Sequence, residues 1–266
     1  CTALKYAEYL SPVTLYGTGA TNYSTYLFNG CTSLERVVLN SNIRSIPGYT
    51  FMDCTSLTTI DLYDPSTGMI TESDAGVASL PAGLTYMGAH SFENTAIREI
   101  TIPRGVTSSM TAMFSGCTKL EKVMLHDALT VIEEEMFMNC SSLKTVQYMT
   151  AENALCGEEN AVTLPGSIKE VADNAFNASG VLKVYFPATV TNAGDYLFAN
   201  CAQLTTVVLD DALTEIGPYM FDNAPALKTI QTYTVAEDGS YVITGEEGKG
   251  MLPSLLEELG DGAFSG

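Results

Sequence analysis

The sequence predicts a β-rich repeat solenoid, a right-handed superhelix of short coils with one short parallel strand in each coil. Three observations support this fold. A motif of the form Phe-x-x-Cys-x-x-Leu recurs along the 266 residues, each copy runs into a short stretch in which apolar and polar residues alternate, and the copies are regularly spaced. A single coil of this size cannot bury its apolar positions, so such coils stack and share one core.

Nine copies of the motif can be aligned. Five nearly complete copies begin at Phe28, Phe51, Phe114, Phe137 and Phe198, looser copies begin at Phe92, Phe176 and Phe221, and a truncated copy begins at Phe264. The apolar residues that follow have a period of two, as in Val37 and Leu39 or Ile60 and Leu62, and this period predicts a strand. We therefore expect phenylalanine, leucine and valine or isoleucine to form continuous columns inside the solenoid.

The distances between successive phenylalanines show a second period. They are 23, 41, 22, 23, 39, 22, 23 and 43 residues, so every third coil carries an insert. The inserts comprise about residues 64–81, 150–165 and 234–253, and each ends in Leu-Pro. Because parallel strands lie about 4.8 Å apart, we expect inserts three coils apart to emerge about 15 Å from one another along the same edge. Tyr233-Thr234-Val235 and Tyr241-Val242-Ile243 predict a hairpin in the third insert.

We expect residues 1–266 to form a single solenoid domain. The C-terminal Phe264-Ser265-Gly266, followed by the N-terminal Cys1-Thr2-Ala3-Leu4, would recreate the repeat motif. The chain therefore begins and ends at the same phase of the repeat, and we interpret it as a fragment of a longer array.

The charge of the chain excludes several classes of partner. There are 12 Lys and Arg residues against 31 Asp and Glu residues, a formal net charge of −19. Nucleic-acid binding depends on clustered cations that neutralise phosphates, and an anionic membrane surface is disfavoured for the same reason. No apolar run approaches the roughly 18 residues of a membrane span, so we expect no membrane insertion of this segment.

The repeat resembles a known family. The consensus I-x-x-I-G-x-x-x-F-x-x-C-x-x-L-x-x-V-x-L/I-P is seen in Ile216-Gly217 with Phe221, and in Phe92 with Ile97 and Ile100-Thr101-Ile102-Pro103. It is similar to the BspA-type leucine-rich repeats over nearly the whole chain, apart from the inserts and the stretch around residues 13–22. The resemblance implies a secreted or surface-anchored bacterial protein that acts in adhesion or protein binding without enzymatic activity. The resemblance assigns no catalytic or ligand-binding residues to this chain, because the family motif is structural.

Six of the seven cysteines occupy one repeat position. They are Cys1, Cys31, Cys54, Cys117, Cys140 and Cys201. Other coils carry Thr95, Ser179 or Ala224 there, which indicates a small buried residue and favours free thiols. A disulfide between adjacent coils, as in Cys31 with Cys54, stays open as the alternative. The seventh, Cys156, lies in the second insert and is the most reactive candidate.

No pattern of residues predicts a catalytic or metal centre. Neighbouring ladder cysteines lie too far apart in sequence for a zinc motif, and His90 and His126 occupy different phases of the repeat without a fixed serine or cysteine partner. The acidic inserts leave calcium as an alternative, with Glu237-Asp238-Gly239 as a turn that could present oxygens, although a solvated hairpin is favoured. We expect no enzyme activity and no cofactor.

The cations give the sharpest positional signal. Seven of them recur in the gap between the motif leucine and the strand, and we call this set the basic stripe: Lys5, Arg36, Arg98, Lys122, Lys144, Lys183 and Lys228. Three glutamates share these gaps, so the stripe has a net charge of +4 while the rest of the chain has −23. The stripe marks one end of the parallel sheet, the surface on which solenoids commonly bind partners. The alternative is that these cations only interleave with glutamates on adjacent strands.

The predicted function is a non-catalytic binding or adhesion module at the bacterial cell surface or outside the cell. We expect a monomer that recognises a protein or peptide, such as one on a host surface, on the sheet face. The ligand-binding candidates are Arg36, Arg98, Lys122, Lys144, Lys183, Tyr185 and Lys228. One alternative is a structural spacer that projects another domain. Another is a glycan-binding module that depends on Tyr185, the only aromatic residue expected in the outward strand column.

Overall fold

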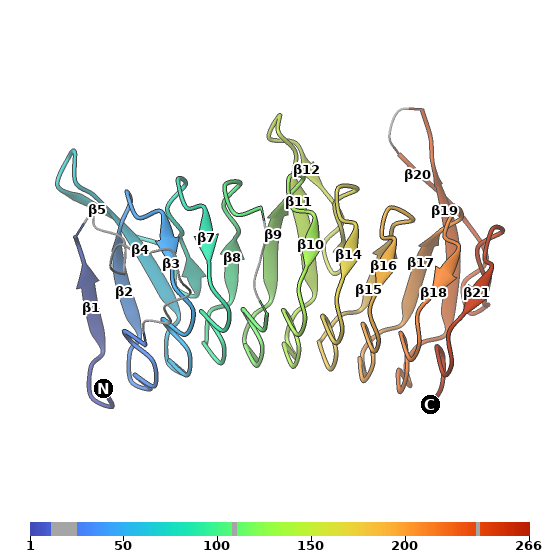
Figure 1. Cartoon of the computed structure of the whole chain (residues 1–266), viewed down its shortest axis with the longest axis horizontal. Coiled ribbons are helices and arrows are strands. Elements are labelled where there is room, and N and C mark those ends of the chain that lie inside the picture. The colour runs from blue at the N-terminus through green and yellow to red at the C-terminus, as the bar shows by residue number, and fades with distance from the viewer. Residues whose placement is uncertain (12–25, 108–110, 238–239) are drawn as a thin grey trace.

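The computed structural model describes residues 1–11, 26–107, 111–237 and 240–266. Within these ranges the chain is an elongated solenoid whose coils stack along its long axis, and all of its regular secondary structure is strand (Figure 1). No helix that could cross a membrane occurs among the described residues. The stretch around residues 13–22, which lacks the repeat, lies outside the described ranges.

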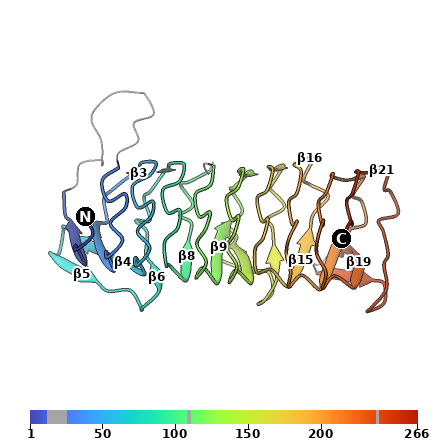
Figure 2. The same cartoon turned by 90° about the horizontal axis from the view of Figure 1, so that it is seen from below.

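One parallel sheet runs the length of the solenoid and forms one of its sides (Figure 2). Its parallel strands are β1 (Tyr6–Tyr9), β2 (Arg36–Asn40), β4 (Thr59–Asp64), β6 (Val77–Ala78), β8 (Glu99–Thr101), β9 (Lys122–His126), β11 (Thr145–Met149), β13 (Val162–Thr163), β15 (Lys183–Phe186), β17 (Thr206–Asp210) and β19 (Thr229–Val235). The alternating apolar residues point into the core, as Val37 and Leu39 show with no exposed surface. The predicted parallel-strand solenoid is therefore confirmed.

Upstream of the phenylalanine, most coils form a second strand of two residues that ends in an apolar residue. These strands are β3 (Ser45–Ile46), β7 (Tyr86–Met87), β10 (Val131–Ile132), β14 (Glu170–Val171), β16 (Asn192–Ala193), β18 (Glu215–Ile216) and β21 (Glu258–Leu259). They form three small parallel sheets of two or three strands. The sequence pattern had indicated only one strand per coil, because two residues are too few to show a period.

The nine motif phenylalanines form one continuous column of stacked rings. Ring centroids in successive coils lie 5.1 to 5.8 Å apart. The backbone around each ring is held by hydrogen bonds to the next coil: the amides of Glu135, Phe137 and Asn139 each donate to a carbonyl at 2.8 to 3.0 Å. Glu135 and Asn139 are both in the left-handed region, with φ of 56° and 60°. The second of these positions is glycine, asparagine or aspartate in eight of nine coils, because these residues tolerate that conformation best.

The motif cysteines are small buried donors. All seven cysteines are free thiols, and five of the six motif cysteines are buried. The thiols of Cys54, Cys117, Cys140 and Cys201 each donate to the backbone carbonyl of the phenylalanine in the preceding coil, at 3.0 to 3.3 Å. Thr95 and Ser179 fill the same place, and their hydroxyls lie 3.3 and 3.4 Å from the cysteine sulfur of the following coil. The column therefore selects a small side chain, which forms a hydrogen bond where it is cysteine, threonine or serine.

Each insert adds a hairpin to the main sheet, and the first two inserts also add a parallel strand. The hairpin strands β5 (Met69–Thr71), β12 (Leu155–Cys156) and β20 (Tyr241–Thr244) pair antiparallel with β4, β11 and β19. The hairpin predicted in the third insert is confirmed, and all three emerge at the same edge (Figure 1). The first two inserts then return to the sheet as β6 and β13, and the third returns through a parallel bridge of Gly250 to Ile230.

The extra strands change the dimensions of the solenoid. Four strand steps separate β4 from β11, so the inserts lie about 19 Å apart along the sheet rather than the expected 15 Å. On the opposite side, only three ring-to-ring steps of 5.3 to 5.8 Å separate Phe51 from Phe137. The spacing between strands is shorter than the spacing between stacked rings. The added strand makes up for this difference, so the sheet and the phenylalanine column remain comparable in length.

Removing a ring from the middle of the column should destabilise the protein far more than removing one from its end. We expect Phe137→Ala to lower the free energy of unfolding by about 3–5 kcal/mol, since the ring is fully buried between two others. Phe264→Ala is the matched control, because this ring is half-buried and stacks on Phe221 alone in the described chain, and it should cost about 1–2 kcal/mol. Denaturant unfolding measures both, and equal losses would contradict a continuous column.

The thiols should fall into two reactivity classes. Burial raises the pKa of Cys54 to about 12 and that of Cys117 and Cys201 to about 11. Because the thiolate is the nucleophile, we expect a thiol-reactive disulfide reagent at pH 8 to modify two residues promptly, Cys1 and Cys156, which are exposed and half-buried. All seven should react in denaturant. Prompt reaction of a third thiol in the folded protein would show that the cysteine column opens.

Candidate ligand-binding surface

The three inserts are fastened over the outer face of the sheet in the same way. In the strand before each insert, a buried threonine hydroxyl accepts a hydrogen bond from an insert amide. The pairs are Thr59 with Gly76 (3.4 Å), Thr145 with Asn160 (3.0 Å) and Thr229 with Gly248 (3.0 Å). We call this contact the threonine latch. The sequence contained the signal, since these threonines recur 86 and 84 residues apart, always one position before the inward residue that opens the strand.

A second contact, two residues further along the same strands, reinforces the latch. The Asp61 carboxylate accepts from the amide of Ser73 at 2.8 Å. At the equivalent positions the Gln147 and Gln231 side chains donate to insert carbonyls at 3.0 and 3.1 Å. Each insert is therefore held at two outward-facing positions, and the outer face beneath it is closed to a partner.

Between the second and third inserts, tyrosines cover the sheet. Tyr185, on β15, is 2% exposed and packs with Val208 and Tyr233. Tyr241 of the third insert lies over this group, with its ring centroid 5.4 Å from that of Tyr185 and 4.6 Å from that of Tyr233. Tyr185 points outward from the sheet as expected, but it does not present its ring to solvent, because the third insert, which follows two coils later, folds back over it.

One acidic side chain of the second insert, Glu158, binds both the hydroxyl of Tyr185 and the neighbouring lysine. The Tyr185 hydroxyl donates to Glu158 at 2.7 Å, and Lys183 donates to the same carboxylate at 3.2 Å while its ammonium lies 4.5 Å from the Tyr185 ring centroid. Burial opposes the ionisation of Glu158, but these two hydrogen bonds outweigh it and lower the pKa of the carboxyl. Tyr185 is therefore a structural residue in this arrangement, and a sugar platform would have to lie elsewhere.

Between the first and second inserts the sheet is open. The outward residues there are Glu99 and Thr101 on β8 and Lys122 and Met124 on β9, and we call them the open face. Glu99 and Thr101 are exposed, and Lys122 and Met124 are half-buried. The open and covered stretches differ in the size of their outward side chains. Thr101 is at the repeat position that Tyr185 occupies 84 residues later.

The structure places the basic stripe along one end of the sheet, and most of its members are paired with acids. Five ion pairs are formed: Lys5 with Glu35, Arg36 with Asp61, Arg98 with Glu121, Lys122 with Glu159, and Lys183 with Glu158. Hydrogen bonds from Arg98 and Lys122 lower the pKa of Glu121 and Glu159. Two of the partners, Glu158 and Glu159, come from an insert, which sequence reasoning could not anticipate.

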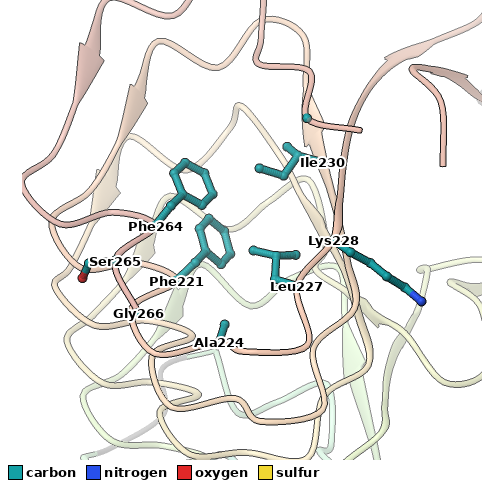
Figure 3. Close-up of a pocket in the computed structure, with 9 residues that line it drawn as sticks. Phe221, Ala224, Leu227, Lys228, Ile230, Phe264, Ser265 and Gly266 are labelled. Atoms are coloured by element: carbon teal, nitrogen blue, oxygen red, sulfur yellow. The ribbon is translucent and has the colours of Figure 1, made fainter. Parts of the chain in front are cut away.

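Two members of the basic stripe differ from the others in having no acidic partner among the described residues. Lys144 and Lys228 are exposed and form no ion pair within the described part of the chain. Lys144 lies beside the open face, whereas Lys228 lies at the last coil, where a hollow of about 260 Å³ opens against Phe221 and Phe264. Figure 3 shows the Lys228 ammonium directed away from these rings. The seven cations therefore occupy the same position of the repeat, but they do not form one continuous positive surface.

A hollow adjoins each end of the open face. The polar hollow, of about 320 Å³, is lined by charged side chains that include Glu99, Lys122 and Lys144. The apolar hollow, of about 460 Å³, lies where β4, β8 and β9 end, and Ile102 and Leu125 contribute to its wall. Both volumes are within the lower part of the range of ligand sites, and both open beside the same two strands.

The polar groups of the apolar hollow are few and mostly satisfied. His126 is buried, its Nε2 lies 3.0 Å from the carbonyl of Val106, and its Nδ1 accepts from the amide of Ala128. Burial lowers the pKa of His126, so the imidazole is neutral at pH 7. Arg104 at the rim pairs with Asp127 through one of its nitrogens.

The alternatives raised by the sequence find little support in this geometry. Among the described residues no three His, Cys, Asp or Glu side chains come together in a way that could hold a metal ion. Asp238, which the calcium hypothesis used, lies outside the described residues. His90 pairs with Glu93 at 2.6 Å and stacks on Tyr49.

Fold and surface define a leucine-rich-repeat solenoid that carries a partly covered sheet face. The family model described as BspA type leucine rich repeat region (6 copies) matches residues 3–75, 76–159 and 154–247. The chain therefore belongs to the BspA-type leucine-rich-repeat family. Proteins of this family are generally non-catalytic repeat proteins. No curated protein matches the sequence significantly.

Solved structures of other leucine-rich-repeat proteins are similar to the chain. A leucine-rich repeat protein from Bacteroides ovatus is 18% identical, with a TM-score of 0.41, over 98% of this chain and 84% of its own. A leucine rich cell surface protein from Faecalibacterium prausnitzii is 18% identical, with a TM-score of 0.31, over 85% of this chain and 87% of its own. The pneumococcal vaccine antigen PcpA is 13% identical, with a TM-score of 0.45, over 85% of this chain and 62% of its own.

Breaking one threonine latch should release one insert locally. Thr145→Val keeps the shape of the side chain but leaves the Asn160 amide without its acceptor, which we expect to cost about 1–3 kcal/mol. Hydrogen exchange of residues 155–161 should accelerate at least tenfold. Thr206→Val is the control, because this residue is in the same column of a strand that no insert follows, and it should leave that exchange unchanged. Similar exchange in both variants would show that the latch does not hold the insert.

Proposed function

We propose that the protein is a non-catalytic binding or adhesion module that recognises a protein or peptide on the open face, outside the bacterial cell or at its surface. The observation that carries the proposal is that the sheet is covered beneath the inserts and exposed between the first two of them, with a hollow at each end of this exposed stretch. A structural spacer has no need of such a surface. Membership of the BspA-type family supports the location and the absence of catalysis.

Within the basic stripe, the cations next to the open face are the strongest candidates for contact with a partner. Lys144 is exposed and unpaired within the described chain, so it can form a new ion pair without breaking an existing one. Arg98 and Lys122 would have to exchange Glu121 and Glu159 for groups of the partner, which exposed ion pairs permit at little cost. Arg36, Lys183 and Lys228 lie farther along the sheet and are proposed as secondary contacts.

The first two inserts form the walls of the surface. The second insert places an acid at the open face, since Glu159 pairs with Lys122, and Glu72 of the first insert lies near Arg36 on β2. A partner with a large negative charge would be repelled by these acids and by the net charge of −19. The surface therefore favours an uncharged or mixed-charge segment of protein over an anionic polymer.

Charge reversal on the open face should weaken binding of peptides selected on the folded protein from a random display library. We expect the triple variant Arg98→Glu, Lys122→Glu, Lys144→Glu to weaken their affinity at least tenfold, mainly by slowing association. Fluorescence polarisation with the labelled peptides measures the effect.

The matched control is the triple variant Lys119→Glu, Lys169→Glu, Lys249→Glu, because it changes the net charge equally at exposed sites outside the open face, and affinity should stay within twofold. If the triple variant is folded and binds the peptides as tightly as the wild type, the proposed surface is wrong. If no peptide is selected at all, the spacer function is favoured instead.

A further inference from the structure

The apolar hollow is a local departure from the repeat. We call three successive coils, the first of which carries an insert, a triplet. The register of the sheet makes the first two triplets equivalent, because Ile60, Ala78 and Ile100 pair in the first as Val146, Val162 and Val184 pair in the second. Three residues at or near the hollow in the first triplet have larger counterparts in the second: Leu62, Thr101 and Ile102 correspond to Tyr148, Tyr185 and Phe186. The hollow thus lies where the next triplet places aromatic rings.

The aromatic residues of the second triplet show what such a place accepts. Phe186 has no exposed surface and packs edge-on against Phe198, with ring centroids 6.4 Å apart. Tyr148 packs against the core and Tyr185 is buried beneath the third insert. The backbone of the repeat therefore accommodates aromatic side chains at these positions. In the first triplet the residues there are smaller, and the hollow is left.

The lining of the hollow determines which group it can receive. Its walls include Leu62, Ile102, Leu125 and Met149, and its histidine is buried, which lowers the pKa of the imidazole. An unpaired charge placed there would lose its hydration without compensation. An aliphatic or aromatic side chain loses nothing and is removed from water, which is favourable.

The rim of the hollow supplies hydrogen-bond donors. Arg104 stands where the next triplet has Ala188, so the cation and the hollow occur together. One guanidinium nitrogen pairs with Asp127, and the side chain is 47% exposed, which leaves further N–H groups directed to solvent. These donors suit a backbone carbonyl better than a carboxylate, because Asp127 already balances the charge of Arg104.

We propose that the apolar hollow receives one aliphatic or aromatic side chain from an extended, non-acidic segment of a partner protein, whose backbone carbonyl accepts a hydrogen bond from Arg104. The inference rests on the proposed function, since it names the anchor by which the partner is held on the open face. The two hollows lie at opposite ends of β9, where Lys122 lines one and His126 the other, four residues or about 13 Å apart, so a short extended segment reaches both.

The anchor can be tested without the partner by methyl NMR, using N-acetyl-leucinamide as an apolar probe and N-acetyl-serinamide as a polar control. We expect saturable shifts of the Ile102, Leu125 and Met149 methyl signals with the leucine probe, and no saturable shift with the serine probe. Burial of a leucine side chain corresponds to roughly a tenfold to hundredfold difference in affinity between them. Equal responses to both probes, or no saturable response to the leucine probe, would overturn the assignment.

The second triplet supplies the blocking variants. Leu62→Tyr with Ile102→Phe should fill the hollow with residues that the fold already accepts and abolish the response of Leu125 and Met149. Ile102→Phe alone serves if the double variant is not folded by its NMR spectrum. Arg104→Ala, which copies Ala188, should weaken the probe about threefold or more. A folded, filled variant that still binds the probe would show that it binds elsewhere.

The same variants separate this inference from the proposed function. If filling the hollow leaves the affinity of the display-selected peptides unchanged while charge reversal abolishes it, the open face is the binding surface and the anchor is wrong. If the probe binds the hollow but neither change affects the peptides, the hollow is real and the partner surface lies elsewhere.

Discussion

The stacking of each phenylalanine on the next is the constraint on which the rest of the structure depends. Phe51 and Phe92 are separated by 41 residues, yet their rings are 5.3 Å apart, as close as those of coils with no insert. Because the column and its backbone hydrogen bonds tolerate no gap, extra residues must leave the solenoid on the opposite side, at the sheet. The inserts therefore emerge at one edge, and each adds a strand there.

The position of the inserts then decides which part of the sheet a partner can reach. The latches hold the inserts over the outer face at three equivalent places, and the stretch beyond the second insert is closed by Tyr185, Tyr233 and Tyr241. The stretch beyond the first insert carries Thr101 and Met124 instead and stays open. A nearly regular repeat thus acquires one distinct surface through a few differences in side-chain size rather than through a change of fold.

The sequence was sufficient to predict the solenoid, the inward residues and the edge at which the inserts emerge, because repetition averages out the ambiguity of any single coil. It also indicated buried thiols, since cysteine exchanges with Thr95 and Ser179. It was not sufficient for the surface. The burial of Tyr185 and the ion pairs of Lys122 and Lys183 depend on insert residues whose position over the sheet follows from hairpin geometry, which has no repeat to reveal it. The returning strands β6 and β13 are too short to show a period.

The central claim is that partners contact the sheet between the first and second inserts, and site-specific photo-crosslinking tests it most directly. Benzoylphenylalanine placed at Thr101, on the open face, should crosslink the display-selected peptides in high yield. The same group at Thr130, an exposed residue that precedes β10 outside the main sheet, should give none. Equal crosslinking at both positions, or crosslinking at Thr130 alone, would contradict the claim.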